Sequence, residues 1–279
     1  MRSDSTGLMK KAVSSRNLTG RSDSNRRFAK GDFDKWVSGL LRRFRFSNVL
    51  DLCCGTGNQL VLFAALPGVS EIYGIDRSKD SLYIARQRLD KIEGSARVIL
   101  KAADMEGLFR THLFEDSRFD LISCFYGLYY SKDPVKTLTD MVGHLGDNGS
   151  VMIVGPYGKN NSALFRLLKR HFELPELVLR SSETFMEKEV YPALKGSCEV
   201  TEDSFVNRVS YPDVASLIKY WRSSTFYFPE HEAAVRRDIE KHFKDDKEFI
   251  IEKHVKAYIG RKIINEHKSA GAQEHRKDL

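Results

Sequence analysis

The spacing of apolar positions along this chain changes near residue 48. Before that point apolar residues recur at intervals of three and four, which predicts an amphipathic helix over about 33–44. Its apolar positions are Phe33, Trp36, Val37, Leu40, Leu41 and Phe44. Beyond that point short apolar runs alternate with amphipathic segments, a pattern typical of βαβ units around a parallel sheet.

Five apolar runs predict strands, over 48–53, 71–75, 97–101, 119–125 and 149–155. The segments between them predict helices near 58–66, 79–91 and 134–145. Asp133 and Pro134 support the last of these, because they are typical of a helix N-cap and of the first helical position. The pattern predicts an α/β fold: a Rossmann-like, doubly wound, mostly parallel seven-stranded sheet with helices on both faces and an inserted lid region.

The pattern becomes less regular after Pro156. It predicts a helix over 161–172, a polar stretch to about 199, a strand over 200–210, helices starting at Asp213 and near 230, and a last strand with alternating apolar residues. The predicted division of the chain is a basic, flexible arm (1–30), a core (31–160), a lid or substrate-binding insertion (161–247), the final strand of the core (248–264) and a polar tail (265–279).

Composition narrows the class of protein. The 279 residues are 41% hydrophobic and 30% charged, as in an ordinary soluble protein with a sizeable core. The longest apolar run covers only 60–66, and no signal-peptide pattern is present, so we expect a cytoplasmic protein without membrane contact. The four cysteines form no C-x-x-C pair, so reduced core thiols and no metal site are expected.

The net charge of +7 is concentrated at one end of the chain. Residues 1–30 hold eight basic and two acidic residues, and the other 249 residues carry a net charge of only +1. A nucleic-acid-binding core is expected to carry its own basic face, so a nucleic acid is an unlikely partner.

The segment from Asp51 to Asn58 carries the most chemical information. An apolar strand runs into the turn Gly55-Thr56-Gly57, where glycines let a ligand approach the backbone closely. Asp76 ends the next strand, 21 residues after Gly55, where a carboxylate can accept hydrogen bonds from the hydroxyls of a ribose.

Two cofactors fit such a turn, a dinucleotide and S-adenosylmethionine. The dinucleotide pattern G-x-G-x-x-G requires a third glycine where this chain has Leu60. Asp51 would add negative charge near a diphosphate, whereas it suits the ammonium and sulfonium groups of S-adenosylmethionine. We therefore favour S-adenosylmethionine, with S-adenosylhomocysteine as the product.

The sequence resembles the class I S-adenosylmethionine-dependent methyltransferases over roughly residues 45–157. Four segments match that family's motifs in order: 51–57, 74–76, 103–105 and 119–123. The resemblance implies that residues 51–58 hold the methionine part of the cofactor and that Asp76 holds the ribose. It also implies that Asp104 and Met105 contact the adenine and that Arg77 covers its face. The implied cofactor-binding residues are Asp51, Cys53, Gly55, Thr56, Gly57, Asn58, Asp76, Arg77, Ala103, Asp104, Met105, Ser123 and Phe125.

Three tyrosines follow the fourth strand and are the candidates for catalysis. Tyr126, Tyr129 and Tyr130 stand where the resemblance places the transferred methyl group, and they are suited to line a pocket, bind substrate or polarise the nucleophile. Packing beneath the next helix is an equally good interpretation of each. No histidine has a clear catalytic setting.

Three functions remain open. The favoured one is methyl transfer to an oxygen or nitrogen of a small molecule, such as a sugar, nucleotide-sugar or secondary metabolite, by in-line displacement under an aromatic lid. The second is an RNA or protein methyltransferase guided by the basic arm, whose binding would weaken steeply with salt. The third is a cofactor-binding protein without catalysis. The sequence gives no oligomeric state.

Overall fold

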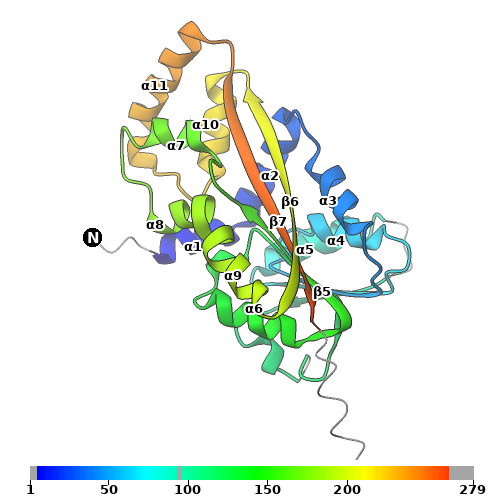
Figure 1. Cartoon of the computed structure of the whole chain (residues 1–279). Helices are drawn as coiled ribbons and strands as arrows, with labels where there is room; N and C mark the ends of the chain where they lie inside the picture. Colours follow the sequence, from blue (N-terminus) through cyan, green and yellow to red (C-terminus); the bar gives the residue numbers. More distant parts are fainter. Residues whose placement is uncertain (1–4, 93–95, 113, 264–279) are drawn as a thin grey trace, which may run out of the picture.

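Seven strands form one sheet in the order β3-β2-β1-β4-β5-β7-β6. The computed structural model describes residues 5–92, 96–112 and 114–263 (Figure 1). The strands are β1 (Asn48–Leu52), β2 (Glu71–Asp76), β3 (Arg97–Ala102), β4 (Phe119–Phe125), β5 (Leu145–Pro156), β6 (Cys198–Tyr211) and β7 (Phe249–Lys262). The expected α/β fold class is confirmed, and the five predicted core strands match β1 to β5.

The order of the strands fixes where a ligand can bind. Strands β1 to β5 are parallel, and β7 is antiparallel to both β5 and β6. The chain adds β2 and β3 on one side of β1 and then crosses to add β4 and β5 on the other. The loops after β1 and β4 therefore leave adjacent strands in opposite directions, and this is where open α/β sheets bind ligands.

Helices surround the sheet. The α-helices are α1 (Ser5–Val13), α2 (Ser15–Phe28), α3 (Phe33–Leu41), α4 (Asn58–Ala64), α5 (Lys79–Leu89), α6 (Pro134–Gly143), α7 (Ser162–Leu168), α8 (Glu176–Leu179), α9 (Tyr191–Lys195), α10 (Val214–Ser223) and α11 (Glu232–Asp245). Two π-helical segments, η3 (Arg180–Thr184) and η4 (Met186–Val190), link α8 to α9, and 3-10 turns occupy η1 (Leu108–Arg110), η2 (Leu128–Tyr130) and η5 (Pro229–His231).

Both faces of the central strands are buried, which explains their continuous apolar sequence. Val49 packs with residues of α3, α4 and α5 on one face. Leu50, its neighbour in β1, packs with residues of α6, η4 and α9 on the other face. The central sheet is therefore a rigid support between two helical layers.

The strands β6 and β7 build a second centre of packing. They pair along their full lengths and rise past the other strands toward α7, α10 and α11 (Figure 1). A third apolar cluster fills this end, with Trp221 of α10 fully buried among residues that include Leu164, Val209 and Ile251. The predicted insertion thus has its own core, and its role as a lid stays a prediction.

The prediction of a flexible arm over 1–30 is wrong for the residues that the structure describes. They form α1 and α2, and α2 packs beside α10. Polar contacts hold α2 in place: Arg21 Nη1 donates to the carbonyl of Ser223 (2.7 Å), and the hydroxyls of Ser24 and Tyr211 lie 3.2 Å apart. No residue of α2 is buried, so the helix has no apolar stripe for a periodicity analysis to detect.

The polar stretch predicted up to about residue 199 is in fact largely helical and partly buried. The segment from Glu176 to Lys195 is nearly continuous helix, and Phe185, Met186 and Val190 are buried against the sheet. Its two π-helical segments shift the apolar residues away from a 3.6-residue period, which hides the helix in the sequence.

The ends of the chain lie outside the described residues. The predicted polar tail over 265–279 falls there, as do residues 1–4. Among the helices that are described, none combines the length and the apolar character needed to cross a bilayer.

Candidate active site

The turn after β1 has an unusual backbone. Cys53, Gly55 and Gly57 all have positive φ angles, of 58°, 53° and 79°. Gly57 is the N-cap of α4, and a Cβ atom there would lie 2.8 Å from Cβ of Ala85. Glycine is therefore required both by the left-handed backbone and by the close approach of α5. The turn lies at the carboxyl edge of the sheet, and the amide of Gly57 donates to the carbonyl of Cys54 within it.

Asp51 supplies a buried carboxylate at this edge. Its Oδ1 accepts a hydrogen bond of 2.6 Å from the hydroxyl of Ser123, and its Oδ2 has no partner within the described part of the chain. Burial raises the pKa of Asp51 to about 7, opposed by the bond from Ser123 and reinforced by Asp76. A buried oxygen without a donor favours a ligand that brings a cationic or N–H group to it.

Asp76 lies across the turn from Asp51. Its Oδ2 accepts from the amide of Gly55 and its Oδ1 from the amide of Ser78, each at 2.8 Å. Burial raises the pKa of Asp76, while the two amides oppose the shift. Both oxygens keep lone pairs toward the strand ends, so the carboxylate can accept hydroxyl donors such as those of a ribose.

The residues after β2 and β3 meet beside Asp76. Arg77 Nε lies 3.3 Å from Asp104 Oδ2, and both side chains are about half exposed. The amide of Ala103 donates to the carbonyl of Asp76, and Met105 is buried in the core. These residues lie together as expected, and their contacts with an adenine ring stay a prediction.

The structure adds one arginine that the sequence analysis did not single out. Arg88 of α5 is half buried, and its Nη1 donates to the carbonyl and the hydroxyl of Thr56, each at 3.1 Å, and to Oδ1 of Asn58 at 2.5 Å. Arg88 thus ties the glycine turn to α5. It lies 30 residues after Asn58, so only the packing of α5 on the turn reveals its role.

Helix α2 covers the other side of the turn. Asn58 Nδ2 donates to Ser22 Oγ and Arg26 Nη2 donates to Asn58 Oδ1, both at 3.4 Å. Leu18 lies 3.6 Å from the position of a Cβ on Gly55. The basic segment therefore lies over the turn.

The three candidate tyrosines have different settings. Tyr126, at a positive φ of 54°, is 38% exposed and faces Phe33 across 6.1 Å between ring centroids. Tyr129 is buried and makes an edge contact with Phe185, while Tyr130 is half buried against Tyr129. Tyr126 and Tyr130 thus keep exposed surface, whereas Tyr129 is packed in the core, and a catalytic role for any of the three stays a prediction.

The remaining predicted residues support the site from beneath. Phe125 is buried in the sheet, and Ser123 acts through its bond to Asp51. Burial raises the pKa of the Cys54 thiol, and the carboxylates of Asp51 and Asp76 raise it further, so this thiol stays protonated. Among the described side chains no group of three or more His, Cys, Asp or Glu residues is arranged to hold a metal ion.

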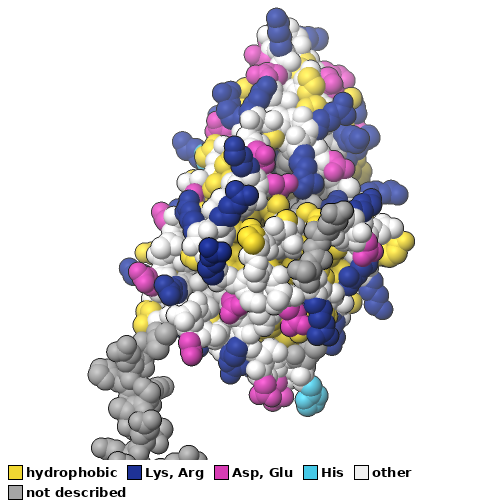
Figure 2. Space-filling model, turned by 90° about the vertical axis from the view of Figure 1, so that its right-hand side faces the viewer, with side chains coloured by type: hydrophobic (Ala, Val, Ile, Leu, Met, Phe, Trp, Pro, Cys, Tyr) yellow, Lys and Arg dark blue, Asp and Glu magenta, His cyan; other side chains and the backbone are white. Residues whose placement is uncertain are grey.

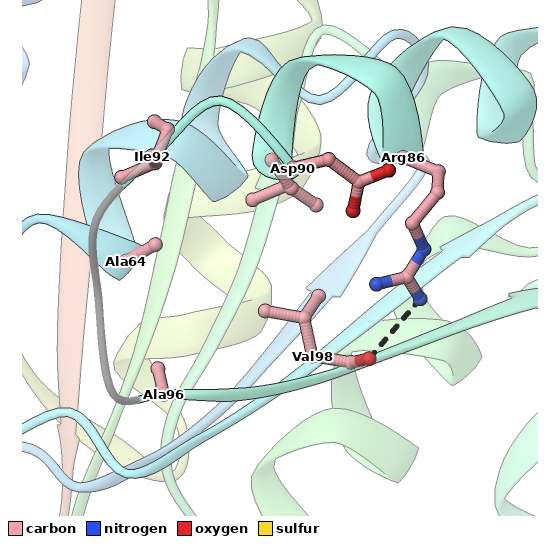
Figure 3. Close-up of a pocket in the computed structure, with 7 residues that line it drawn as sticks. Ala64, Arg86, Asp90, Ile92, Ala96 and Val98 are labelled. Atoms are coloured by element: carbon pink, nitrogen blue, oxygen red, sulfur yellow. Dashed lines mark hydrogen bonds between the residues drawn. The ribbon is translucent and has the colours of Figure 1, made fainter.

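The hollow shown in Figure 3 lies away from this site. It has a volume of about 170 Å³ and lies where α5 ends and β3 begins, at the edge of the sheet opposite to Asp76. Arg86 closes one side by donating to the carbonyl of Val98 at 3.1 Å. Because it holds no residue of the glycine turn, we assign it no part in the chemistry.

Comparison with known proteins decides the family. A methyltransferase-domain family profile matches residues 45–207, more than half of the chain. The chain belongs to this methyltransferase family. Class I membership and S-adenosylmethionine as the cofactor follow, as expected from the sequence. Asp51, with one oxygen that has no hydrogen-bond partner, and Asp76, which accepts two backbone hydrogen bonds, fit that cofactor.

Individual relatives of this chain are distant. A demethylmenaquinone methyltransferase of Lactiplantibacillus plantarum is 34% identical over 97 residues, which cover 34% of this chain and 39% of that protein. A 2-phytyl-1,4-naphtoquinone methyltransferase of Trichormus variabilis is 28% identical over 151 residues, 54% of this chain and 63% of the relative. The crystal structure of the YcgJ protein from Bacillus subtilis superimposes with a TM-score of 0.56 at 16% identity, covering 83% of this chain and all of that one.

Proposed function

We propose that this methyltransferase moves the methyl group of S-adenosylmethionine to a small aromatic molecule that carries a ring hydroxyl. The observation that carries the proposal is a set of aromatic rings from separate elements, gathered around the loop that packs against the glycine turn. Tyr126 and Tyr130 follow β4, Phe33 comes from α3 and Tyr220 comes from α10. Flat rings on several sides suit a flat acceptor better than a sugar.

The relatives support an aromatic acceptor. The two curated relatives are named for a demethylmenaquinone and for a 1,4-naphthoquinone. The reduced form of such a quinone carries two ring hydroxyls. The sugar and nucleotide-sugar acceptors expected from the sequence have no support in these names, and they stay an untested alternative.

The residues of the chain divide the work between cofactor and acceptor. When bound, the cofactor supplies a methyl group on a positively charged sulfur, which a lone pair can displace. Asp51 and Asp76 would hold its charged end and its ribose. Tyr126 and Tyr130 would orient the acceptor and exclude water, so that positioning supplies most of the rate.

The alternative of an RNA acceptor finds less support. Arg21 and Arg26, which the sequence analysis counts in the basic arm, bond within the protein to Ser223, Asp34 and Asn58. Basic and acidic side chains are interspersed on the face that Figure 2 shows. Binding to a polynucleotide is expected to need a continuous basic surface.

The test is a transfer assay with tritiated S-adenosylmethionine. The acceptors are 1,4-dihydroxynaphthalene, a catechol, a nucleotide-sugar and a mixed RNA. Label in the dihydroxynaphthalene or the catechol supports the proposal, while label confined to the sugar or the RNA contradicts it. The Asp76→Ala variant should lose cofactor binding by calorimetry, and Asp245→Ala, an exposed aspartate in α11, serves as the matched control.

A further inference from the structure

A lysine of β7 lies at the same edge of the sheet as the aromatic rings. The register places Asp51 beside Ser123, Met152 and Ile259 across four strands. Side chains alternate along a strand, so Lys253, six residues before Ile259, is on the face of the sheet that Asp51 occupies. Lys253 lies beyond the pairing of Pro156 with Val255, past the carboxyl end of β5.

The side-chain nitrogen of Lys253 has neutral hydrogen-bond partners. Its Nζ donates to the side-chain oxygen of Asn161 and to the hydroxyl of Tyr220, and it lies 4.3 Å from the centre of the Tyr220 ring. Over the described residues, no carboxylate oxygen lies within 4 Å of this nitrogen. The backbone of Asn161 is held beside β7, because its backbone N–H donates to the carbonyl of Glu252 at 3.0 Å.

The charged group that faces Lys253 is another cation. The guanidinium of Arg21, on α2, lies near enough to act on Lys253, Tyr220 and Tyr130. Burial, together with the nearby cation of Arg21, lowers the pKa of Lys253 to about 7. The other polar groups that face Lys253 are neutral, namely Asn161 before α7, Tyr220 on α10 and Asn207, its partner on β6. The neighbouring residues of β7, Glu252 and His254, point to the opposite face of the sheet.

A neutral amine fits these partners. A neutral lysine has two N–H donors and one lone pair, so donation to Asn161 and Tyr220 uses both hydrogens and leaves the lone pair free. Tyr220 also lies near Tyr126: burial raises the pKa of Tyr126, and the nearby Tyr220 raises it further. Lys253, Tyr220 and Tyr126 therefore lie in one cluster of side chains.

We propose that Lys253 is the catalytic residue that takes the proton from the hydroxyl group of the aromatic acceptor. This inference rests on the proposed function. The O–H bond of the acceptor breaks, its electron pair stays on the acceptor oxygen, and the proton forms the third N–H bond of Lys253. The neutral pair becomes an ammonium and an oxyanion, and the oxyanion is the nucleophile for the methyl group. Lys253 then returns its proton to water.

A binding experiment tests the proton transfer without turnover. 1-Naphthol, whose ionised form has its own absorption band, is titrated against the protein saturated with S-adenosylhomocysteine. In the parent the bound naphthol should ionise at least one pH unit below its value in water. In Lys253→Met it should stay neutral over that range, and in Lys256→Met, a lysine on the opposite face of β7, it should behave as in the parent.

Kinetics with the dihydroxynaphthalene acceptor give the second readout. In the parent kcat/KM should rise with pH through a limb near 7, as the amine loses its proton. Lys253→Met should lower kcat/KM by about 100-fold and remove this limb, and Lys253→Arg, which keeps the charge, should not restore it. Unchanged binding of S-adenosylhomocysteine shows that each variant is folded.

The two proposals fail in different ways. A parent that ionises bound naphthol but methylates no aromatic acceptor contradicts the proposed function alone. A parent that methylates the acceptor while Lys253→Met keeps both the naphthol ionisation and the pH limb overturns the role of Lys253. Naphthol that does not bind to the parent, or that binds and stays neutral there, also overturns it.

Discussion

The backbone of Gly127 lies directly against the side chain of Cys53. A Cβ atom on Gly127 would be 2.4 Å from Cβ and 2.7 Å from Sγ of Cys53. This contact joins the loop after β4 to the turn after β1, the two loops that diverge at the switch point of the sheet. The loop that carries the three candidate tyrosines is therefore packed against the glycine turn.

Gly127→Ala is expected to destabilise the protein by roughly 1–3 kcal/mol, because the added methyl group has no space beside Cys53. Urea unfolding measures the change. Gly39→Ala is the matched control: that position in α3 has no atom within 4 Å of an added Cβ, so alanine should be neutral or stabilising by up to about 1 kcal/mol. Equal stability of the two variants would contradict the close contact.

Arg88→Met should weaken binding of S-adenosylmethionine by about tenfold or more, since the glycine turn loses three hydrogen bonds from one guanidinium. Calorimetry measures the affinity. Arg86→Met, two residues earlier in α5, removes only the bond to Val98 at the far edge of the sheet and should leave the affinity unchanged. A similar loss in both variants would show that α5 acts as a whole.

Asp51 should make stability fall as the pH rises from about 4 to about 7. Its pKa in the folded state is about 7, above the usual value of about 3.9 in an unfolded chain, so in this range the folded state binds the additional proton. The contribution is at most roughly 4 kcal/mol. Urea unfolding of the parent and of Asp51→Asn at pH 5 and pH 7.5 isolates it, because the asparagine does not titrate. A difference in stability between the two proteins that stays constant with pH would refute the assignment.

Gly20→Val should loosen α2 from α10, because a Cβ atom on Gly20 already approaches Cβ of Ser223 to 3.2 Å. Amide hydrogen exchange should become faster across α2 and stay unchanged in β1 and β4. Gly143→Val, at an open position at the end of α6, should have no effect on α2. Unprotected α2 amides in the parent would contradict the packing described for this helix.

The sequence by itself determined the parts of this protein whose signals are local. The strands β1 to β5 could be predicted because both faces of a parallel strand are buried, which requires a continuous apolar run. The cofactor side could be predicted because Asp51, the glycine turn and Asp76 follow one another within a single βαβ unit. The fold class followed from the alternation of apolar runs with amphipathic segments, and class I membership and the cofactor followed from this unit and the two later motifs. The comparisons with known proteins confirmed all three.

Only the tertiary structure decided the features that depend on contacts between distant segments. Helix α2 is held by polar bonds to residues about 200 positions away, so its sequence alone looked like a flexible arm. The three candidate tyrosines lie within five residues and have the same chemistry, and only the packing shows that Tyr129 is buried and Tyr126 exposed. In the sequence Lys253 is one polar position of a strand with alternating apolar residues, and its partners Asn161 and Tyr220 come from other elements. Such roles depend on which side chains the fold brings together in space, and residue spacing along the chain does not carry that information.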